Sequence, residues 1–508
     1  MPQAERGQVL TEEQFLRLAA YGEAEQVEPG WNLYSTGDDS YDLFLLLTAE
    51  VDIVLEPDHV IYRTLPGDFL GELSLLTGQH VYLTARVVAA GTVVRIDAER
   101  LRRALAEQVD IADVLLTAFR DRREAIRSAA GGALEIIGHP DSAATLALRT
   151  YVEQLLLPHT FREADSADDD LPAAIVNGSS LRRATPGTLA EALGLTYRPG
   201  DRPVDLVVVG AGPAGLAAAV SGASEGLVTV LLDRSGIGGQ AAKSARIENY
   251  LGFPEGVSGL HLARLAMVQA LKFGVRIHAP CAVASLDLSD ERRPVVVLEN
   301  GERIPCRAVI AATGAQYRRL DIPGWARFEK SGCIRYAATE SDVRGYENHP
   351  VTVVGGANSA GQAALSLAAN GAHVDLVIRG HDLKLRMSSY LADRILAHPR
   401  IRVHTGGTIL ELAGDDVLTS IVVESSERLP SRALFCFVGA DPVSGWLAGV
   451  ATADDGFIRT ESSLPFQTSA PRVFAVGDLR SGSTKRVATA VGEGASAVSS
   501  VHTALAGD

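Results

Sequence analysis

Residues 206–215 read Leu-Val-Val-Val-Gly-Ala-Gly-Pro-Ala-Gly and decide the fold of most of this chain. Four apolar residues typical of a buried strand lead into the pattern GxGxxG, and an alanine-rich helical pattern follows. The next strand-like run, VTVLLD, ends at Asp233. A strand before the glycines, a helix after them and an acid about 20 residues later form the full context of a dinucleotide-binding unit. We therefore expect a dinucleotide-binding α/β fold to begin at Val204.

The three glycines of this turn have separate physical roles. Gly210 permits the tight turn, Gly212 removes a side chain where the backbone approaches a pyrophosphate, and Gly215 lets the helix pack closely on the strand. The helix N-terminus stabilises the phosphate charge. Asp233 would accept hydrogen bonds from a ribose diol. The alternative is a glycine turn without a ligand, and the complete context argues against it.

A second glycine turn follows about 145 residues later. Residues 351–354 form a strand-like run, residues 355–360 read Gly-Gly-Ala-Asn-Ser-Ala, and a helical pattern and the strand VDLVI follow. Ala357 replaces the glycine that lets the backbone meet the pyrophosphate, which predicts weaker binding than at the first turn. Where the first copy has an acid, this copy has cations at Arg379, His381, Lys384 and Arg386. Such cations suit a 2′-phosphate, so NADPH is favoured over NADH; a solvated basic loop is the alternative.

The composition limits the classes of function. The 508 residues suffice for about three or four domains, and the formal net charge of −15 does not favour nucleic-acid binding. The four cysteines, Cys281, Cys306, Cys333 and Cys436, have no CxxC spacing. They predict neither a disulfide framework nor a zinc site, and no HExxH or other metal motif occurs. We expect no metal.

The N-terminus and the apolar segments predict a cytoplasmic protein without a membrane partner. The first 15 residues lack the basic and apolar segments of a signal peptide. The stretch 206–224 has the length of a membrane span, but its glycines and proline are typical of strand, turn and helix.

The chain before residue 204 divides into two patterns. Short strand-like runs at Asn32–Ser35, Tyr41–Leu47, Val51–Leu55, Val60–Leu65 and Thr92–Ile96 predict a small β-roll, and a helical pattern covers 98–127. The segment 134–195 shows strand-like LEIIG and PAAIV, a helix at 143–157 and a short helix near Leu189. We expect a small α/β unit there, followed by a linker at 196–203.

Further short motifs surround the first glycine turn. Gly238-Gly239-Gln240 and Ile247-Glu248-Asn249-Tyr250 follow the first acid, and Val473-Phe474-Ala475-Val476-Gly477-Asp478 is a strand ending in a Gly-Asp pair. Together with AATG at 311–314, GGANSA at 355–360 and FVGADP at 437–442, these motifs resemble the low-molecular-weight thioredoxin reductases over roughly residues 204–508.

The resemblance implies two three-layer dinucleotide-binding α/β domains, FAD and NADPH as cofactors, and a homodimer. The FAD domain would be split into 204–318 and 435–508, with an NADPH domain at 319–434. The resemblance implies that Gln240 and Asn249 lie at the isoalloxazine, Asp478 at the ribityl chain, and Lys485 with Arg486 and Val487 at the pyrimidine edge. The FAD contacts would be Gly210, Gly212, Pro213, Ala214, Gly215, Asp233, Arg234, Gly239, Gln240, Asn249, Ala312, Thr313, Gly314, Gly477, Asp478, Lys485, Arg486 and Val487. The NADPH contacts would be Gly355, Gly356, Asn358, Ser359, Ala360, Arg379, His381, Lys384 and Arg386.

The sequence departs from this family at the redox dithiol. Where the family carries Cys-Ala-Thr-Cys, residues 337–340 read Ala-Ala-Thr-Glu. Thiol–disulfide exchange needs an attacking thiolate and a resolving sulfur, so thioredoxin reduction by the family route is not expected. Cys333 lies nearby, and we interpret it as a packing residue. Glu340 is the only candidate catalytic residue, with a solvated loop residue as the alternative.

The first 128 residues resemble cyclic-nucleotide-binding domains through VEPG at 27–30, LYSTGDDSYDLFLLL at 33–47 and PGDFLGELSLL at 66–76. The resemblance implies Glu72 as the ribose ligand. Tyr82 stands about where the family has its phosphate-binding arginine, and Arg86 is out of register. Because a buried phosphate needs a cation, a structural or altered-ligand role is favoured over cyclic-nucleotide binding.

Residues 129–200 resemble half of a glutaredoxin-like fold and would form a small thioredoxin-like unit. At the usual dithiol position this segment reads His139-Pro140-Asp141-Ser142, so it offers no thiol.

These observations favour an oxidoreductase that passes a hydride from NADPH to FAD and then electrons to an unknown acceptor. The acceptor could be a ferredoxin or flavodoxin, a quinone, oxygen or the disulfide of a partner protein. The alternative is a flavoprotein sensor without turnover that binds a nucleotide or partner through its N-terminal domain.

Overall fold

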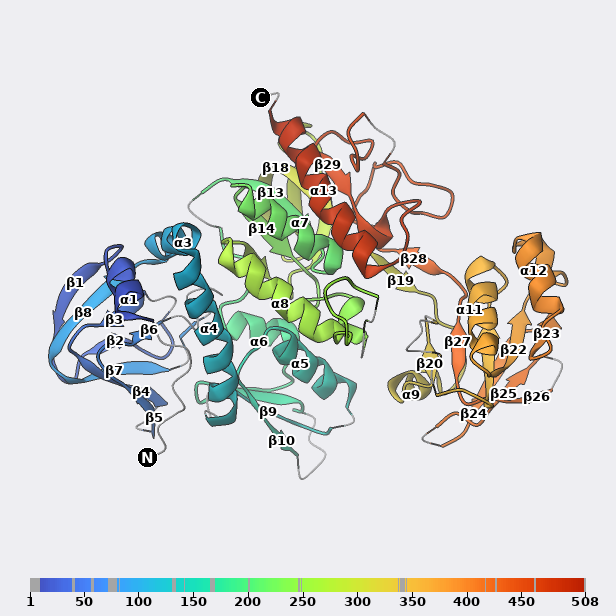
Figure 1. Cartoon of the computed structure of the whole chain (residues 1–508), viewed down its shortest axis with the longest axis horizontal. Helices are drawn as coiled ribbons and strands as arrows, with labels where there is room; N and C mark the ends of the chain where they lie inside the picture. Colours follow the sequence, from blue (N-terminus) through green and yellow to red (C-terminus); the bar gives the residue numbers. More distant parts are fainter. Residues whose placement is uncertain are drawn as a thin grey trace. The chain divides into compact units, whose positions relative to one another are not determined.

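The chain forms two compact units, one holding each glycine turn (Figure 1). The first unit comprises residues 1–245, 258–314 and 444–508, and the second comprises residues 246–257 and 315–443. The computed structural model describes all residues except 1–9, 39–41, 56–58, 72–79, 82, 130–133, 141, 165–169, 200–201, 245–246, 248, 337, 339–342, 344, 416, 425–426, 461–462 and 507–508.

The N-terminal part of the first unit is a β-rich domain of two antiparallel sheets, ordered β1-β8-β3-β6 and β2-β7-β4-β5. Apolar side chains such as Phe44 and Ile53 fill its core. The expected strands are confirmed within one or two residues at most ends. The elements are α1 (Glu12–Ala19), β1 (Glu23–Val27), β2 (Asn32–Tyr34), β3 (Leu43–Leu46), β4 (Glu50–Leu55), β5 (His59–Thr64), β6 (Phe69–Leu70), β7 (Thr84–Ala89) and β8 (Gly91–Ile96).

The prediction of one continuous helix over 98–127 is wrong, because two helices occupy this stretch. Helix α3 (Ala98–Glu107) ends at Gln108, and α4 (Val109–Ala129) begins at the next residue. Gln108 leaves the helical conformation, with φ −121° and ψ 79°. Its side-chain oxygen accepts a hydrogen bond from Arg17 of α1 at 2.7 Å. The break between the helices thus coincides with a tertiary contact. The period of apolar residues in the sequence gives no sign of such a contact.

Residues 134–192 form the expected small α/β unit, with the sheet order β10-β9-β11-β12. Strands β9 and β10 are parallel, whereas β11 is antiparallel to both β9 and β12. Residues 165–169, in the acidic stretch between β10 and β11, lie outside the described residues. The elements are β9 (Leu134–Gly138), α5 (Ala143–Gln154), β10 (Thr160–Glu163), β11 (Ala173–Val176), β12 (Ser179–Leu181) and α6 (Pro186–Ala192).

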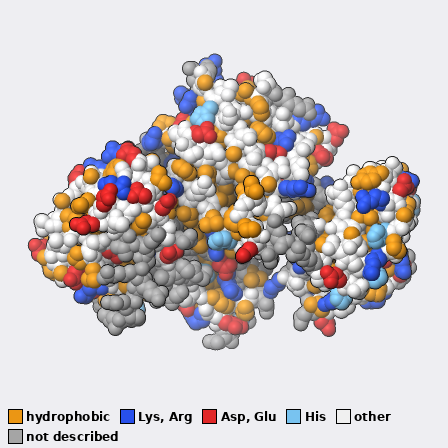
Figure 2. All heavy atoms as spheres, in the orientation of Figure 1, with side chains coloured by type: hydrophobic (Ala, Val, Ile, Leu, Met, Phe, Trp, Pro, Cys, Tyr) orange, Lys and Arg blue, Asp and Glu red, His pale blue; other side chains and the backbone are white. Residues whose placement is uncertain are grey.

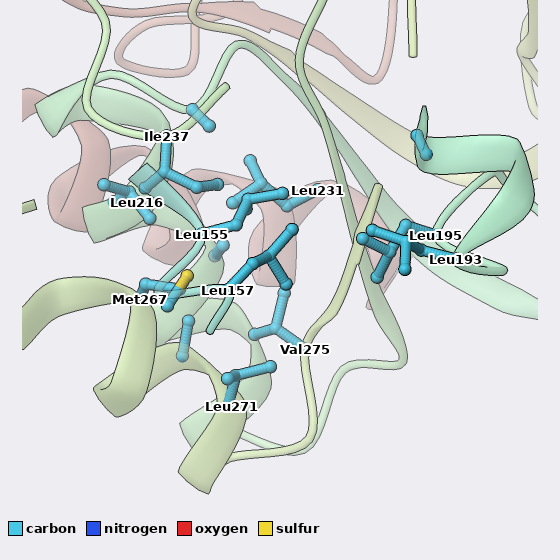
Figure 3. Close-up of a cluster of buried hydrophobic side chains, with 14 of the residues drawn as sticks. Leu155, Leu157, Leu193, Leu195, Leu216, Leu231, Ile237, Met267, Leu271 and Val275 are labelled. Atoms are coloured by element: carbon cyan, nitrogen blue, oxygen red, sulfur yellow. The ribbon is translucent and has the colours of Figure 1, made fainter. Parts of the chain in front are cut away.

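The small unit shares an apolar core with the fold that carries the first glycine turn (Figure 3). Leu155, Leu157 and Leu195 line one small cavity together with Met267 and Leu271 of α8, and Figure 3 shows Leu155 and Leu157 on the side of Met267. Two polar contacts reinforce this packing: the Tyr151 hydroxyl donates to the Ala279 carbonyl at 2.9 Å, and Arg264 donates to the Glu153 carbonyl. Since these side chains are buried together, the small unit packs as part of the neighbouring fold.

The β-rich domain also contacts this core. The backbone N–H of His80 donates to the Leu193 carbonyl of the small unit at 2.9 Å. Asp113 of α4 forms an ion pair with Lys272 of α8 at 3.6 Å.

The first dinucleotide-type fold is a seven-stranded sheet ordered β15-β14-β13-β18-β17-β16, with β29 paired to β18. Strands β15, β14, β13, β18 and β29 are parallel, so their carboxyl ends meet at one edge. Buried helices α7 and α13 cross each other (Figure 1). The elements are β13 (Val204–Val209), α7 (Pro213–Ser224), β14 (Thr229–Leu232), η1 (Ala241–Lys243), α8 (Gly259–Lys272), β15 (Arg276–His278), β16 (Val283–Asp287), β17 (Val295–Leu298), β18 (Arg303–Ala311), β29 (Val473–Ala475), η3 (Gly477–Leu479) and α13 (Val487–Leu505).

The second unit is built on a parallel sheet ordered β20-β27-β21-β22-β23, accompanied by the antiparallel sheets β24-β25-β26 and β19-β28. Its elements are β19 (Ala315–Tyr317), α9 (Trp325–Lys330), β20 (Ile334–Arg335), β21 (Pro350–Val354), α11 (Asn358–Ala369), β22 (His373–Ile378), η2 (Leu383–Leu385), α12 (Ser389–Leu396), β23 (Ile401–Thr405), β24 (Ile409–Ala413), β25 (Ser420–Val423), β26 (Arg428–Pro430), β27 (Leu434–Cys436) and β28 (Ala440–Pro442).

No described helix is long and apolar enough to cross a bilayer. No group of three or more described His, Cys, Asp or Glu side chains is arranged to hold a metal ion. On the face shown in Figure 2, acidic and basic side chains are interspersed.

Candidate functional site

The first glycine turn joins β13 to α7 and is tightly enclosed by backbone. Gly210 has φ +108°, and a Cβ there would lie 2.4 Å from the Ala312 carbonyl oxygen. A Cβ on Gly215 would lie 1.7 Å from the Gly210 carbonyl oxygen. Both positions therefore require glycine, as the sequence predicts. Pro213 and Ala214 form the first residues of α7.

The backbone of Gly212 is open on the side where a dinucleotide would approach. A Cβ on Gly212 would have only the Gly239 Cα near it, at 4.0 Å. Gly212 is the N-cap of α7 and has no side chain to satisfy the first helical N–H groups. The first N–H groups of α7 therefore have no side-chain cap and can face an anion, as a pyrophosphate site requires.

Asp233 lies at the carboxyl end of β14 and stabilises the turn directly. Its Oδ2 accepts a hydrogen bond from the Ala211 N–H at 2.8 Å. Its Oδ1 accepts from the N–H groups of Ser235 and Gly236. Arg234, the next residue, is exposed and lies 4.0 Å from Glu299.

The Gly-Gly-Gln motif packs onto the same turn. The Gly238 N–H donates to the Ala211 carbonyl at 2.7 Å, and a Cβ on Gly239 would lie 3.0 Å from the Gly212 Cα. Gln240 is exposed at the start of η1. The structure therefore brings this motif to the first glycine turn.

Two further loops reach this edge of the sheet. Ala312 donates its N–H to the Val209 carbonyl, and Thr313 accepts a hydrogen bond from the Trp446 indole at 3.5 Å. Gly314 follows with φ +68°. A Cβ on Gly477 would lie 2.9 Å from the Ala214 Cβ, so the loop after β29 also contacts the start of α7.

Asp478 lies in this last loop, in the environment of a cation. Burial raises the pKa of the Asp478 carboxyl; the nearby Lys485 opposes this shift and Glu493 adds to it. Burial lowers the pKa of Lys485, whose ammonium group lies 4.3 Å from the centre of the Phe457 ring. Arg486 is the N-cap of α13 and Val487 its first residue.

Sequence reasoning missed Glu493 and Arg480, which lie behind the Gly477–Asp478 turn. The Glu493 side chain is 8% exposed and forms an ion pair with Arg480 at 2.6 Å. The signal was present, because Glu493 is the single acidic residue of α13. A charge in an otherwise apolar helix indicates a specific partner.

The second glycine turn joins β21 to α11 in the second unit. Gly355 has φ +140°, and a Cβ there would lie 2.3 Å from the Phe437 carbonyl oxygen. A Cβ on Gly356 would lie no closer than 3.8 Å to Ile378. Ala357, the N-cap of α11, is exposed in an extended conformation, and Ala360 is buried.

The residues that follow this turn are placed around the end of β22. The Asn358 side chain accepts a hydrogen bond from the Ser388 N–H at 2.8 Å, and Ser359 is exposed. The four residues expected at the 2′-phosphate are all exposed: Arg379, His381, Lys384 and Arg386. Lys384 forms an ion pair with Asp393 at 2.6 Å, which raises the pKa of Lys384.

The remaining predicted residues lie elsewhere or outside the described chain. Asn249 is exposed in the segment 246–257, which belongs to the second unit. Glu340, and also Glu72 and Tyr82 of the N-terminal domain, lie outside the described residues.

All four cysteines are described and free. Burial raises the pKa of the Cys281 and Cys306 thiols to about 12 and that of Cys436 to about 11. The Cys333 sulfur is buried, accepting hydrogen bonds from the Ser331 hydroxyl and the Leu418 N–H. Its position in a packed core agrees with the packing role predicted for it.

Two regions of the chain match known protein families. The pyridine nucleotide-disulphide oxidoreductase family matches residues 204–494, more than half of the chain. This chain belongs to that family. A cyclic nucleotide-binding domain matches residues 24–108.

Thioredoxin reductases are similar to this chain over the same region. Those of Neurospora crassa and Chlamydia pneumoniae are 32% and 33% identical to it, over 57% of this chain and 90% and 94% of their own lengths. Among solved structures, the thioredoxin reductase of Streptococcus pyogenes matches with a TM-score of 0.53 and 28% identity. That match covers 61% of this chain and 100% of the other.

The family assignment confirms the thioredoxin reductase-type dinucleotide-binding folds and the β-rich N-terminal domain. The chain is a pyridine nucleotide-dependent flavin oxidoreductase, and the cofactors of the thioredoxin reductase family are FAD and NADPH.

Proposed function

We propose that this protein transfers a hydride from NADPH to FAD and passes the electrons to an acceptor other than a dithiol of its own. The observation that carries the proposal is the presence of two glycine turns at the carboxyl edges of two parallel sheets, with Asp233 after the first and Arg379 after the second. An acid suits a ribose diol and a cation suits a 2′-phosphate.

The residues of the first unit would hold FAD. The N–H groups around Gly212 bind the pyrophosphate, and Asp233 orients the adenosine ribose while it holds the turn. Asp478 accepts hydrogen bonds from the ribityl hydroxyls. Gln240 and Lys485 lie toward the isoalloxazine. When bound, the two cofactors supply the hydride and electron-transfer chemistry.

The residues of the second unit would hold NADPH. The turn at 355–360 takes the pyrophosphate, with Ala357 limiting how closely the backbone approaches it. Arg379 and Arg386 are exposed and charged, and they suit the 2′-phosphate. Lys384 is already paired with Asp393, so we expect a smaller contribution from it.

The acceptor is proposed to be a ferredoxin or flavodoxin, a quinone, oxygen or a partner's disulfide. The cysteines support this: none is paired, and burial raises the pKa values of three of them far above neutrality. A thiolate is the attacking species in exchange, so these thiols are poor nucleophiles near pH 7. Glu340 stays the candidate catalytic residue.

Three finer features of the architecture belong to the proposal. The unit at 129–200 is a thioredoxin-like domain without a thiol, a view supported by the order and directions of its four strands. The proposed FAD domain comprises 204–318 and 435–508, and the proposed NADPH domain 319–434. The compact units divide a few residues away, at 314/315 and 443/444, because β27 (Leu434–Cys436) lies inside the sheet of the second unit. The protein is a homodimer.

An anaerobic visible spectrum of the purified protein, titrated with NADPH and then with NADH, tests the function. A yellow protein whose oxidised-flavin band NADPH bleaches much faster than NADH does supports the proposal, and dye reduction then opens the search for acceptors. Bound flavin that neither nucleotide reduces would instead favour a sensor. A colourless protein that FAD cannot reconstitute contradicts both.

A further inference from the structure

A buried carboxylate on α13 makes four hydrogen bonds behind the loop that follows β29. Glu493 accepts from the Gly477 N–H at 2.8 Å and from the Ser483 hydroxyl at 2.8 Å. Arg480 donates to both oxygens, from Nε at 3.1 Å and from Nη2 at 2.6 Å. Each oxygen of the carboxylate therefore accepts two hydrogen bonds, and the Arg480 guanidinium balances its negative charge.

These bonds hold a turn that is pressed against the first dinucleotide turn. Gly477 has φ +67°, and a Cβ there would lie 2.9 Å from the Ala214 Cβ. Gly494, directly after Glu493, lets α13 cross α7 closely, since a Cβ there would lie 2.1 Å from the Ala214 carbonyl oxygen. Two adjacent residues of α13 thus join the loop after β29 to the start of α7.

Asp478 lies between Gly477 and Arg480, in the turn that the Glu493 hydrogen bonds hold. Lys485 interacts with Asp478 electrostatically, and Glu493 acts on Asp478 with the opposite sign. The Arg480 side chain is 22% exposed and that of Glu493 8%, so neither is a surface ion pair. Removing one partner of a buried ion pair leaves the other charge buried and unpaired. The local conformation then either changes or becomes less stable.

We propose that Glu493 is a positioning residue for the flavin side of the FAD site. Together with Arg480 it holds the Gly477–Asp478 turn so that Asp478 is presented to the hydroxyl chain between flavin and pyrophosphate. This inference rests on the proposed function. It goes beyond that function by assigning a role to two residues that do not themselves contact the cofactor.

The test uses the full chain freed of FAD and two ligands, FAD and ADP. ADP carries only the adenosine and pyrophosphate groups assigned to the Gly210–Gly215 turn and Asp233, whereas FAD also needs the Gly477–Asp478 turn. For Glu493→Gln we expect the FAD dissociation constant to rise at least about tenfold, because a buried charge pair is broken. The ADP dissociation constant should change less than about twofold, since its contacts are untouched.

Two further variants keep the test interpretable. Glu493→Gln combined with Arg480→Gln removes both charges, so it reports on positioning if the single variant does not fold. Arg307→Gln is the control, since it removes an ion pair with Asp205 at 3.1 Å in the same fold, between the first residues of β13 and the middle of β18. We expect this control to bind FAD and ADP like the unaltered protein.

The outcomes separate the inference from the function on which it rests. If the unaltered protein binds FAD and Glu493→Gln binds it equally tightly, the inference is wrong and the proposed function stands. A parallel loss of FAD and ADP binding in both Glu493 variants would also overturn it, because the role would then be general stability. An unaltered protein that takes up no FAD contradicts the proposed function itself.

Discussion

The two glycine turns start from similar sequences and arrive at different sites. In the first turn, Asp233 folds back to accept a hydrogen bond from the Ala211 N–H, and a Cβ on Gly215 would strike the Gly210 carbonyl. In the second turn, Ala360 is tolerated at the position of Gly215, and Arg379 is exposed where the acid would be. The first glycine is enclosed by backbone in both turns, since a Cβ on Gly355 would lie 2.3 Å from the Phe437 carbonyl oxygen, and the turns differ at the last residue of the motif.

The surroundings of the two folds differ as well. The segment that follows the small α/β unit packs on the edge strand of the first fold, where Tyr197 lies edge-on to His278 of β15 with ring centres 5.2 Å apart. In the second unit the corresponding edge strand, β23, carries His404, which pairs with Asp375 at 2.8 Å. The edge strand therefore carries a histidine packed on a tyrosine in one fold and a histidine paired with a carboxylate in the other.

The largest expected effect is that of Gly215→Ala, which makes the first turn like the second. The added Cβ would lie 1.7 Å from the Gly210 carbonyl oxygen, so the strand and helix must separate. We expect the bound flavin to fall below about a tenth of the normal content and the melting temperature to drop, as for overpacking against backbone. Absorbance ratios of the purified protein measure the first, and a variant that keeps full flavin would refute the comparison.

The next effect is that of Gly212→Ala, which the folded protein itself tolerates. Its Cβ meets only the Gly239 Cα, at 4.0 Å. We expect FAD binding about 10- to 100-fold weaker, or about 1.4 to 2.7 kcal/mol, with an unchanged melting temperature of the FAD-free protein. Titration of the FAD-free protein with FAD measures this, and unaltered affinity would show that no ligand approaches Gly212.

His278 predicts a pH dependence that belongs to the first fold. Burial lowers the pKa of His278 to about 4, and Arg276 contributes. In the unfolded chain the pKa is near 6.5, so the unfolded state binds more protons between pH 6.5 and 4 and stability is lost as pH falls through that range. Between pH 7 and pH 5 the loss should be about 2 kcal/mol, and His278→Phe should remove it. Urea unfolding at both pH values provides the test; equal losses in both proteins would count against a buried neutral histidine.

The positive charge after the second turn should set the preference for NADPH over NADH. Arg379→Gln should lower the ratio of kcat/KM for NADPH to that for NADH by about tenfold, because a charge-assisted contact to the 2′-phosphate is lost. Lys384→Gln is the matched control, and its effect should be smaller because Lys384 is paired with Asp393. Equal ratios for all three proteins would assign the basic residues to a solvated loop.

The smallest effect is expected for Ala357→Gly, which makes the second turn more like the first. Ala357→Gly gives the second turn the residue of the first, and the exposed N-cap has no packing to lose. We expect the dissociation constant for NADPH to fall a few-fold, less than about 1 kcal/mol. A weaker NADPH complex would mean that the flexibility of glycine outweighs the closer approach of the backbone.

Much of the candidate site was predictable because it is local in sequence. The strand, the glycines, the helix and Asp233 lie within 30 residues, and each leaves its own pattern. Glu493 was not predicted as a site residue, since its partners Gly477 and Arg480 come from another element and only packing brings them together. The break at Gln108 was missed for the same reason, because Arg17 meets it from a distant helix.

Local sequence patterns specify the fold class, the two glycine turns and their opposite charges, because backbone sterics and the period of apolar residues act over a few neighbours. What encloses each turn depends on packing between segments far apart in the sequence. The Ala312 carbonyl against Gly210, the Glu493 carboxylate behind Gly477 and the leucines of the small unit against α8 come from remote segments. Their contacts arise when separate elements bury apolar surface together, and that burial has no signature at any single position.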